Sequence, residues 1–273
     1  MDTNISIILP TYNGSKYIQR AIESVISQTY KNWELIIVDD CSSDNSFDII
    51  NNFLHDERIE YFKNDRNLGI QKSLNYGISV AKGYYIARID DDDIWIDKEK
   101  LAKQMAFLEK NKDHVLLGTG VVVYDESNKY LYKYLLPETD KEIRNKILLK
   151  NCFVHSSVIF QKEKFILVGG YDEGEYTRHV EDYDLWLRLG SVGKMINIQE
   201  YSTGFTFREN SLSSKNKIEQ FKKNITLIKK YKNKYPSYSK AITFGYLRLF
   251  LYKIFLLLPF EKLKYKFMIL YKK

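Results

Sequence analysis

The sequence lacks the features that mark several common classes of protein. Its 273 residues include only two cysteines, Cys41 and Cys152, which are too few for a disulfide framework. It does not start with basic residues followed by a long apolar stretch, so we expect no signal peptide and a cytoplasmic protein. Low-complexity segments and internal repeats are also absent. The length fits one α/β core with an extension.

The two common glycine-rich phosphate loops are missing as well. The first apolar run leads into Pro10–Gly14, not into Gly-x-Gly-x-x-Gly, and no Gly-Lys-Ser/Thr loop occurs. A nucleotide bound here must therefore be held by side chains and a metal ion. This favours a nucleotide-sugar over a dinucleotide or ATP as ligand.

A run of four aspartates, Asp90–Asp93, directly follows the apolar residues 84–89. Four adjacent like charges repel one another, and a break in the local rules of folding usually marks a functional site. A hard divalent cation binds carboxylate oxygens and leaves room for substrate phosphates. The run therefore predicts a metal site, with a solvated acidic loop as the alternative.

Strand-like and helix-like segments alternate along the first hundred residues. Apolar runs at residues 5–9, 34–38, 59–62 and 84–89 are typical of strands, and residues 15–29, 45–54 and 70–81 have helical spacing. Gly83 is a helix-termination signal after the last of these. Such alternation predicts a mostly parallel sheet, which binds ligands beyond the carboxyl ends of its strands. Polar residues occur at those ends: Thr11, Tyr12, Asn13, Asp39, Asp40, Asn67 and Asp90–Asp93.

Five segments in order carry a resemblance to a known family. They are Ile8–Gly14, Ile37–Asp44, Asn67–Gly69, Ala87–Asp93 and Glu181–Arg188. Together they resemble the motifs of the inverting glycosyltransferases of family 2, over about residues 4–214. The resemblance implies the GT-A fold, which is a Rossmann-like, mostly parallel mixed sheet flanked by helices. We expect this catalytic domain at residues 1–214 and a helical extension at residues 215–273.

The same resemblance implies a donor site for a nucleotide-sugar, with a UDP-sugar favoured, and Mn²⁺ or Mg²⁺ as cofactor. Asp40 would accept a hydrogen bond from the uracil imide, whereas we expect Asp39 only to cap the following helix. Asp91 would lie near the ribose. Asp90 and Asp92 would form the metal motif, with Asp92 as the direct ligand. The nucleotide-sugar site would comprise Pro10, Thr11, Tyr12, Asn13, Asp40, Asn67, Asp90 and Asp91. The family more often has a small residue at position 91, so the choice of metal-binding carboxylates stays open.

On the acceptor side, the resemblance implies that Asp182 is the general base. A carboxylate within hydrogen-bond reach of the acceptor hydroxyl suits that role, and a single in-line displacement inverts the sugar. Glu181, beside it, is alternatively a first-turn acid that suits the helix dipole. His155 matches a family histidine near the acceptor or is a hydrogen-bonded wall residue. Arg208, in the segment 205–213, meets the diphosphate or is a surface cation.

Charge is concentrated at the C-terminal end. Residues 215–273 contain 16 Lys and Arg against Glu219 and Glu261, a net of +14, which leaves −7 for residues 1–214 of a chain of +7. The apolar stretch 247–258 is short for a membrane-spanning helix. Lysines beside apolar residues favour a helix on an anionic membrane surface, and the alternative is an ordinary helical subdomain. No nucleic-acid-binding module accompanies the charge.

These observations predict a metal-dependent inverting enzyme that transfers a hexose or N-acetylhexosamine to a glycan or lipid-linked acceptor. The expected context is cell-surface polysaccharide biosynthesis, such as capsule or lipopolysaccharide, at the inner face of the membrane. Two alternatives stay open. A nucleotidyltransferase should have a glycine-rich, basic loop after the first strand, where this chain has Thr11–Gly14. A non-catalytic glycan- or nucleotide-binding module would share the fold but not the activity.

Overall fold

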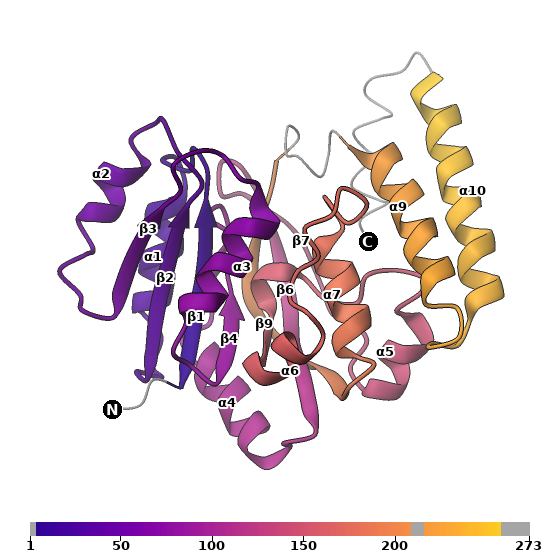
Figure 1. Ribbon diagram of the computed structural model, residues 1–273, viewed down its shortest axis with the longest axis horizontal. Coiled ribbons are helices and arrows are strands. Elements are labelled where there is room, and N and C mark those ends of the chain that lie inside the picture. The colour runs from indigo at the N-terminus through magenta and orange to yellow at the C-terminus, as the bar shows by residue number, and fades with distance from the viewer. Residues whose placement is uncertain (1–3, 209–215, 258–273) are drawn as a thin grey trace.

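The computed structural model describes residues 4–208 and 216–257, and its strands join in a single mixed sheet. The order is β3-β2-β1-β4-β8-β6-β9-β5, with β7 added beside β6. The first half, on the left in Figure 1, is parallel. It consists of β1 (Ile5–Thr11), β2 (Trp33–Asp39), β3 (Ile59–Lys63) and β4 (Tyr85–Arg88).

The second half of the sheet mixes both directions. Its strands are β5 (Ile94–Trp95), β6 (His114–Asp125), β7 (Tyr130–Tyr134), β8 (Ile159–Gln161) and β9 (Lys194–Phe207). β8 lies antiparallel between β4 and β6, β9 runs parallel to β6, and β5 pairs antiparallel with β9. The four aspartates connect β4 to β5 and so lie where the two halves of the sheet meet at their carboxyl-end edge.

Helices cover both faces of the sheet (Figure 1). They are α1 (Ile18–Ile26), α2 (Ser46–Asn51), α3 (Ile70–Val80), α4 (Lys100–Lys110), α5 (Asp140–Lys146), the 3₁₀ turn η1 (His155–Ser157), α6 (Lys162–Leu167) and α7 (Glu181–Leu189). Within β1, Ile8 joins one hydrophobic cluster while Ile7 and Leu9 join another. Since side chains alternate along a strand, both faces of this strand are buried, as expected for a parallel sheet.

After residue 215 the described chain forms two long helices, α9 (Lys217–Lys230) and α10 (Tyr238–Leu257). Leu227 of α9 and Tyr231, the residue after that helix, belong to the hydrophobic cluster that contains Trp186 of α7. The extension is helical as predicted, and it shares a core with the sheet domain, while the boundary at residue 214 stays a prediction. The lysine- and aromatic-rich end after residue 258 lies outside the described residues. Within the described ranges, no helix has both the length and the hydropathy needed to cross a bilayer.

Two local predictions were wrong. Gly83 does not terminate α3, which ends at Val80 with an extended residue after it. A Cβ on Gly83 would lie 2.6 Å from the backbone nitrogen of Ser6, so close approach to β1 explains this glycine. Asp39 does not cap α2. Its Oδ1 accepts from the backbone N–H of Ser42 at 2.7 Å and so closes the turn after β2.

Candidate active site

The residues Asp90–Asp93, here called the acid turn, fold back between β4 and β5. The backbone N–H of Asp93 donates to the carbonyl of Asp90 at 3.2 Å. Asp90 Oδ1 lies 2.6 Å from Arg88 Nη2, and its backbone N–H donates to Ser156 Oγ at 3.0 Å. Asp93 is buried, and its carboxylate accepts from Thr206 N at 2.8 Å and from Ser156 Oγ at 2.5 Å. The first and last aspartates thus fix the turn to the protein.

The two middle aspartates contact residues at the ends of two other strands, β1 and β9. Asp91 Oδ2 accepts from Thr11 Oγ1 at 2.6 Å, at the carboxyl end of β1. Asp92 Oδ2 pairs with Arg208 Nη2 at 2.6 Å, just beyond β9. The Arg208 guanidinium also lies 5.4 Å from the centre of the Tyr17 ring. Residues 209–213, the rest of the segment predicted to meet the diphosphate, lie outside the described residues.

Ionisation differs among the carboxylates of the acid turn. Burial opposes ionisation of Asp90, but the Arg88 guanidinium beside it makes the net effect a lowered pKa. Burial raises the pKa of Asp91 to about 6, and the Asp90 carboxylate adds to the effect. Burial and the charges of Asp91 and Asp90 raise the pKa of Asp92 to about 7. Four carboxyl groups thus face two arginines, Arg88 and Arg208, so full ionisation of the turn would leave a surplus of negative charge.

A divalent cation fits this surplus of charge. In the described part of the chain, no group of three or more His, Cys, Asp or Glu side chains is arranged to hold a metal ion. Mg²⁺ in phosphate-transferring sites is commonly held by only one or two carboxylates, with substrate phosphates and waters as its other ligands. Asp92, with Asp91 or Asp90, offers such a sparse set of hard oxygen donors. The metal role of these residues stays a prediction.

The loop after β1 carries the residues that are predicted to line the nucleoside pocket, and that role stays a prediction. Pro10 and Thr11 are buried at the strand end, whereas the Tyr12 ring is 52% exposed beside them. Asn13 has a φ of 54°, and its backbone N–H donates to Ser42 Oγ at 2.9 Å. This bond joins the loop after β1 to the loop after β2, beside the exposed Tyr12.

Asp40 organises the loop that carries Asn67. Its Oδ1 accepts from Asn64 Nδ2 and from Leu68 N, both at 2.8 Å, and its Oδ2 accepts from Gly69 N at 2.8 Å. A carboxylate offers about four acceptor positions, so one is left for a further donor. Asn67 is exposed on this loop. The nucleoside contacts of Asp40 and Asn67 stay predictions.

The candidate base lies at the start of α7. Asn151 Nδ2 donates to Asp182 Oδ2 at 2.8 Å and fixes the carboxylate. Burial raises the pKa of Asp182 to about 6, and the charge of Asp90 contributes to the shift. Burial and Asp182 raise the pKa of Glu181 to about 7. The structure thus brings Asp182 within electrostatic range of the acid turn, although the two are ninety residues apart in sequence.

His155 begins the 3₁₀ turn η1, and its ring lies within electrostatic range of Asp90 in the acid turn. Its Nε2 is 2.7 Å from the hydroxyl of Tyr171, and its ring meets Trp186 edge-on with 5.8 Å between centroids. Burial and the nearby Arg88 charge lower the pKa of His155 to about 3, so the ring is neutral. The hydrogen-bonded wall is what the structure shows, while contact with an acceptor stays a prediction.

Four residues of the site escaped the sequence prediction. Arg88 is a buried cation in an apolar strand, and that anomaly was the one signal available. Ser156 holds the acid turn and Asn151 holds the candidate base, but their partners are 66 and 31 residues away. The Thr206 backbone holds Asp93 from 113 residues away. Long-range contacts of this kind leave no local pattern.

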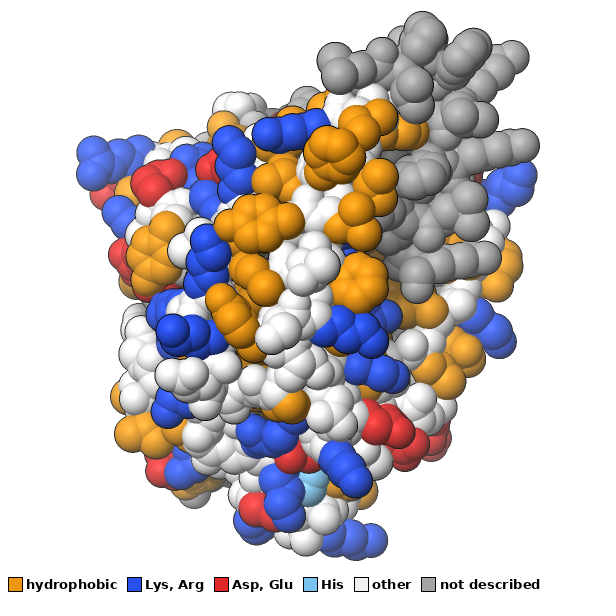
Figure 2. Space-filling view, turned by 90° about the vertical axis from the view of Figure 1, so that its right-hand side faces the viewer, with side chains coloured by type: hydrophobic (Ala, Val, Ile, Leu, Met, Phe, Trp, Pro, Cys, Tyr) orange, Lys and Arg blue, Asp and Glu red, His pale blue; other side chains and the backbone are white. Residues whose placement is uncertain are grey.

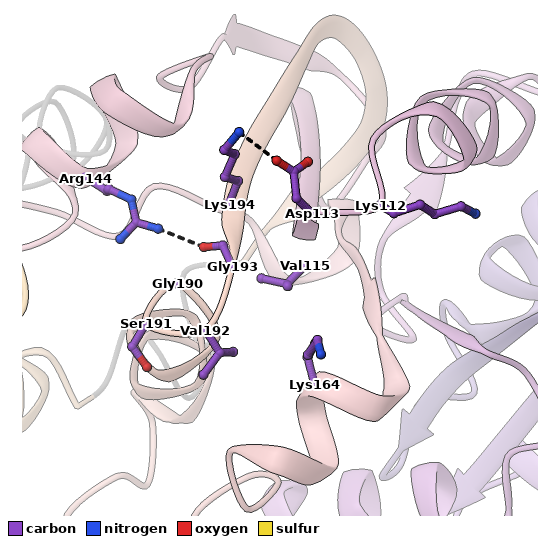
Figure 3. A pocket seen from close by; sticks show the side chains of 10 residues that line it. All are labelled: Lys112, Asp113, Val115, Arg144, Lys164, Gly190, Ser191, Val192, Gly193 and Lys194. Atoms are coloured by element: carbon purple, nitrogen blue, oxygen red, sulfur yellow. Dashed lines mark hydrogen bonds and ion pairs between the residues drawn. The ribbon is translucent and has the colours of Figure 1, made fainter.

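A hollow of about 480 Å³ at the opposite edge of the sheet does not join this site (Figure 3). It lies at the beginnings of β6 and β9. Lys194 Nζ pairs there with Asp113 at 2.6 Å, and Arg144 Nη2 donates to the carbonyl of Gly193 at 2.8 Å (Figure 3). Lys164 pairs with Glu163 at 3.0 Å, so most charged side chains of this hollow have protein partners, and the hollow lies at the other end of the strands from the acid turn.

Comparison with known proteins identifies the family of this chain. The model of the family described as Glycosyl transferase family 2 matches residues 6–167. WfgD of Escherichia coli, a UDP-Glc:alpha-D-GlcNAc-diphosphoundecaprenol beta-1,3-glucosyltransferase, is 34% identical over 227 residues, covering 81% of this chain and 84% of WfgD. WbnJ of Escherichia coli, an O-antigen biosynthesis glycosyltransferase, is 33% identical over 190 residues, covering 68% of this chain and 71% of WbnJ.

Among solved structures, residues 1–349 of S. aureus TarS match with a TM-score of 0.68 at 18% identity, covering 89% of this chain and 70% of that chain. The same part of TarS has been solved with UDP-GlcNAc. The likeness confirms the predicted GT-A fold. With a family match over more than half of its length and relatives of one-third identity over most of it, the chain belongs to glycosyl transferase family 2.

Proposed function

We propose that the protein is a metal-dependent inverting glycosyltransferase that uses a nucleotide-sugar, with a UDP-sugar favoured. The observation that carries this proposal is the pair of acidic sites: a charge-rich turn at the strand ends and a separate, fixed carboxylate at the start of α7. The name of WfgD supports transfer of a hexose to a lipid-linked glycan, and that of WbnJ supports a role in cell-surface polysaccharide biosynthesis. Transfer of an N-acetylhexosamine is the alternative.

In this mechanism, the Asp182 carboxylate accepts the proton of the acceptor hydroxyl as that oxygen attacks the anomeric carbon. The bond from the anomeric carbon to the diphosphate oxygen breaks at the same time, and the diphosphate leaves from the opposite face. Asn151 holds the carboxylate in place for this transfer. A bound Mn²⁺ or Mg²⁺ would neutralise the charge that develops on the diphosphate. Arg208, now paired with Asp92, is a second cation for the same phosphates.

The extension supports peripheral attachment to the inner face of the membrane. Its net charge of +14 lies in residues 215–273, and anionic lipids attract such clusters of Lys and Arg. Hydrophobic side chains also gather over α10, with Lys and Arg beside and below them (Figure 2). Attraction to anionic lipid and burial of apolar surface add to one another in binding at an interface.

Donor binding gives the direct test. The melting temperature should rise with one UDP-sugar in the presence of Mn²⁺, and less without the metal, because a ligand of the folded state stabilises it by mass action. Asp92→Asn should lose the metal-dependent part of the shift. The matched control is Asp113→Asn, which removes a carboxylate at the opposite edge of the sheet and should keep the full response.

An unchanged melting temperature with every UDP-, GDP- and dTDP-sugar, with and without Mn²⁺, would contradict the donor site. If one sugar does shift it, the same donor is then used to follow UDP release with a lipid-linked acceptor. Turnover by Asp182→Asn at the wild-type rate would remove Asp182 from the role of base.

A further inference from the structure

A second hollow, of about 250 Å³, lies between the end of α5 and the first half of α10. Its floor is apolar, formed by Leu149 and Phe244. Four cationic side chains surround this floor: Lys146, Lys150, Lys240 and Arg248. Arg248 Nη1 donates to the carbonyl of Leu149 at 2.5 Å, and this bond holds α10 against the chain that follows α5.

The four cations have no acidic partner among the described residues. In the hollow of Figure 3, by contrast, Lys194 and Arg144 pair with Asp113 and Asp140. Lys240 lies 6.0 Å from the centre of the Phe244 ring and otherwise faces solvent. Four unneutralised cations around an apolar floor match a ligand that has both a phosphate and a hydrocarbon chain.

The hollow continues into an exposed apolar stripe along α10. Phe244, Leu247, Leu251 and Ile254 recur at helical spacing, and each is between 40% and 45% exposed. Residues at this spacing share one face of a helix. Figure 2 shows that hydrophobic side chains gather on the side of the molecule where α10 lies. Since Phe244 belongs to both the stripe and the hollow, the four cations lie at one end of the apolar stripe.

The same hollow adjoins the segment that holds the candidate base. Lys150 precedes Asn151, whose amide donates to Asp182 at 2.8 Å. Tyr183, the next residue of α7, donates from its hydroxyl to the carbonyl of Ile147 at 2.6 Å. The chain from residue 147 to 151 is therefore fixed to the first turn of α7 on one side and lines the hollow on the other.

We propose that this hollow binds the phosphate group of a membrane lipid, with the α10 stripe lying in the hydrocarbon of the same leaflet. The inference rests on the proposed function, since it places a lipid-bound acceptor beside the base. It also assigns an orientation: the α5–α10 side of the molecule faces the membrane, and the acceptor approaches Asp182 from that side.

The test compares vesicles of phosphatidylcholine with vesicles that also contain phosphatidylglycerol. The full-length protein should co-sediment with the anionic vesicles and not with the neutral ones. Lys150→Glu/Lys240→Glu should weaken this binding at least about tenfold, because each cation near an anionic surface contributes measurably to attachment. Leu247→Ser/Leu251→Ser should weaken it as well. The matched control, Lys98→Glu/Lys112→Glu, reverses two exposed lysines elsewhere and should bind like the wild type.

Three results would overturn the inference. The first is that Lys150→Glu/Lys240→Glu binds anionic vesicles as well as the wild type does. The second is that the wild type binds neutral and anionic vesicles equally. The third is that millimolar inorganic phosphate releases the protein from the vesicles, which would make free phosphate the ligand. The UDP-sugar melting shift, measured without vesicles on each variant, separates this inference from the proposed function. A normal shift without lipid binding overturns only the lipid site. Lys150→Glu/Lys240→Glu should fold, since both lysines are exposed and Lys240 lies in the first turn of α10, where a carboxylate suits the helix dipole. Lys98 and Lys112 of the control variant are exposed as well, so it should also fold.

Discussion

The four side chains of the acid turn are chemically identical but have different ionisation equilibria. Asp90 is paired with Arg88 and has a lowered pKa, while burial and neighbouring charge raise the pKa of Asp92 to about 7. The Asp93 side chain is fixed in place, since its two carboxylate oxygens accept hydrogen bonds from Thr206 and Ser156. The role of each aspartate therefore follows from its contacts and not from its position in the run.

The first prediction at this scale concerns Asp182. Its pKa is raised from 3.8 to about 6, so transfer should fall about tenfold per pH unit below about pH 6, as the base becomes protonated. The same shift has a consequence for stability. The folded state binds the proton more tightly than the unfolded chain, so the ionised carboxylate destabilises the fold above about pH 6, and this destabilisation disappears below about pH 4.

Asp182→Asn should therefore abolish transfer and raise the melting temperature at about pH 7.5, but not at about pH 4. The amide keeps a partner for Asn151, so the contact is not lost. Glu57→Gln, which removes one negative charge from an exposed turn residue, serves as the control for the loss of charge. A lower melting temperature for Asp182→Asn at neutral pH would show that the carboxylate is structural.

At the scale of elements, the site depends on the contact between the loop after β1 and the acid turn. A Cβ on Gly14 would lie 2.2 Å from Asp91 Oδ2 and 2.4 Å from Thr11 Oγ1. Gly14 is therefore required by packing between two loops, in addition to its place in a turn. This close approach lets the Thr11 hydroxyl reach Asp91 at 2.6 Å.

We expect Gly14→Ala to displace Asp91 and to weaken UDP-sugar binding at least about tenfold, with a loss of about 1–3 kcal/mol in stability from overpacking. The measurement is a titration of the donor in the presence of Mn²⁺, with a chemical denaturation curve beside it. Gly169→Ala is the matched control. Its φ of +87° makes alanine unfavourable there, but no atom lies within 4 Å of the added Cβ, so donor affinity should not change. Equal donor affinity for Gly14→Ala and the wild type would contradict this packing argument.

At the scale of the whole molecule, the C-terminal helices complete the core behind α7. Leu227 and Ile228 of α9, and Tyr231 just after it, are buried in the cluster that contains Trp186. Tyr235 donates from its hydroxyl to the carbonyl of Leu187 at 2.8 Å, and Lys230 pairs with the buried Asp184 at 3.2 Å. The helix that carries the candidate base is thus supported from both sides.

A chain that ends at residue 214 should be less stable than the full chain by several kcal/mol, since burying each large apolar side chain contributes about 1.5–3 kcal/mol. Circular dichroism and denaturant midpoints check this. A chain that ends at residue 257 keeps α9 and α10 and should retain its fold. Equal midpoints for the chain ending at 214 and the full chain would mean that residues 1–214 form an independent domain.

Local patterns in the sequence predicted most of the parallel half of the sheet. The apolar runs and turn residues near Thr11, Asp40 and Asp90 were enough to place polar groups at one edge, because strand ends are local features. Their precise partners were not predictable. Asp39 closes its own turn, and Asp40 holds the loop of Asn64–Gly69, since these contacts depend on how far each loop reaches in space.

The sequence by itself determined the family, the alternating strands and helices, the acidic run and the basic extension, because each is encoded within a few neighbouring residues. Only the tertiary structure decided which aspartate is paired with Arg88, which residue holds the candidate base Asp182, and where the extension packs. Asp90 is held by Arg88 and Ser156, and Asp182 is held by Asn151. The long-range contacts among these form only when β4, η1 and α7 pack close to one another. Electrostatics and burial depend on distances in three dimensions, and those distances exist only after the two halves of the sheet have joined.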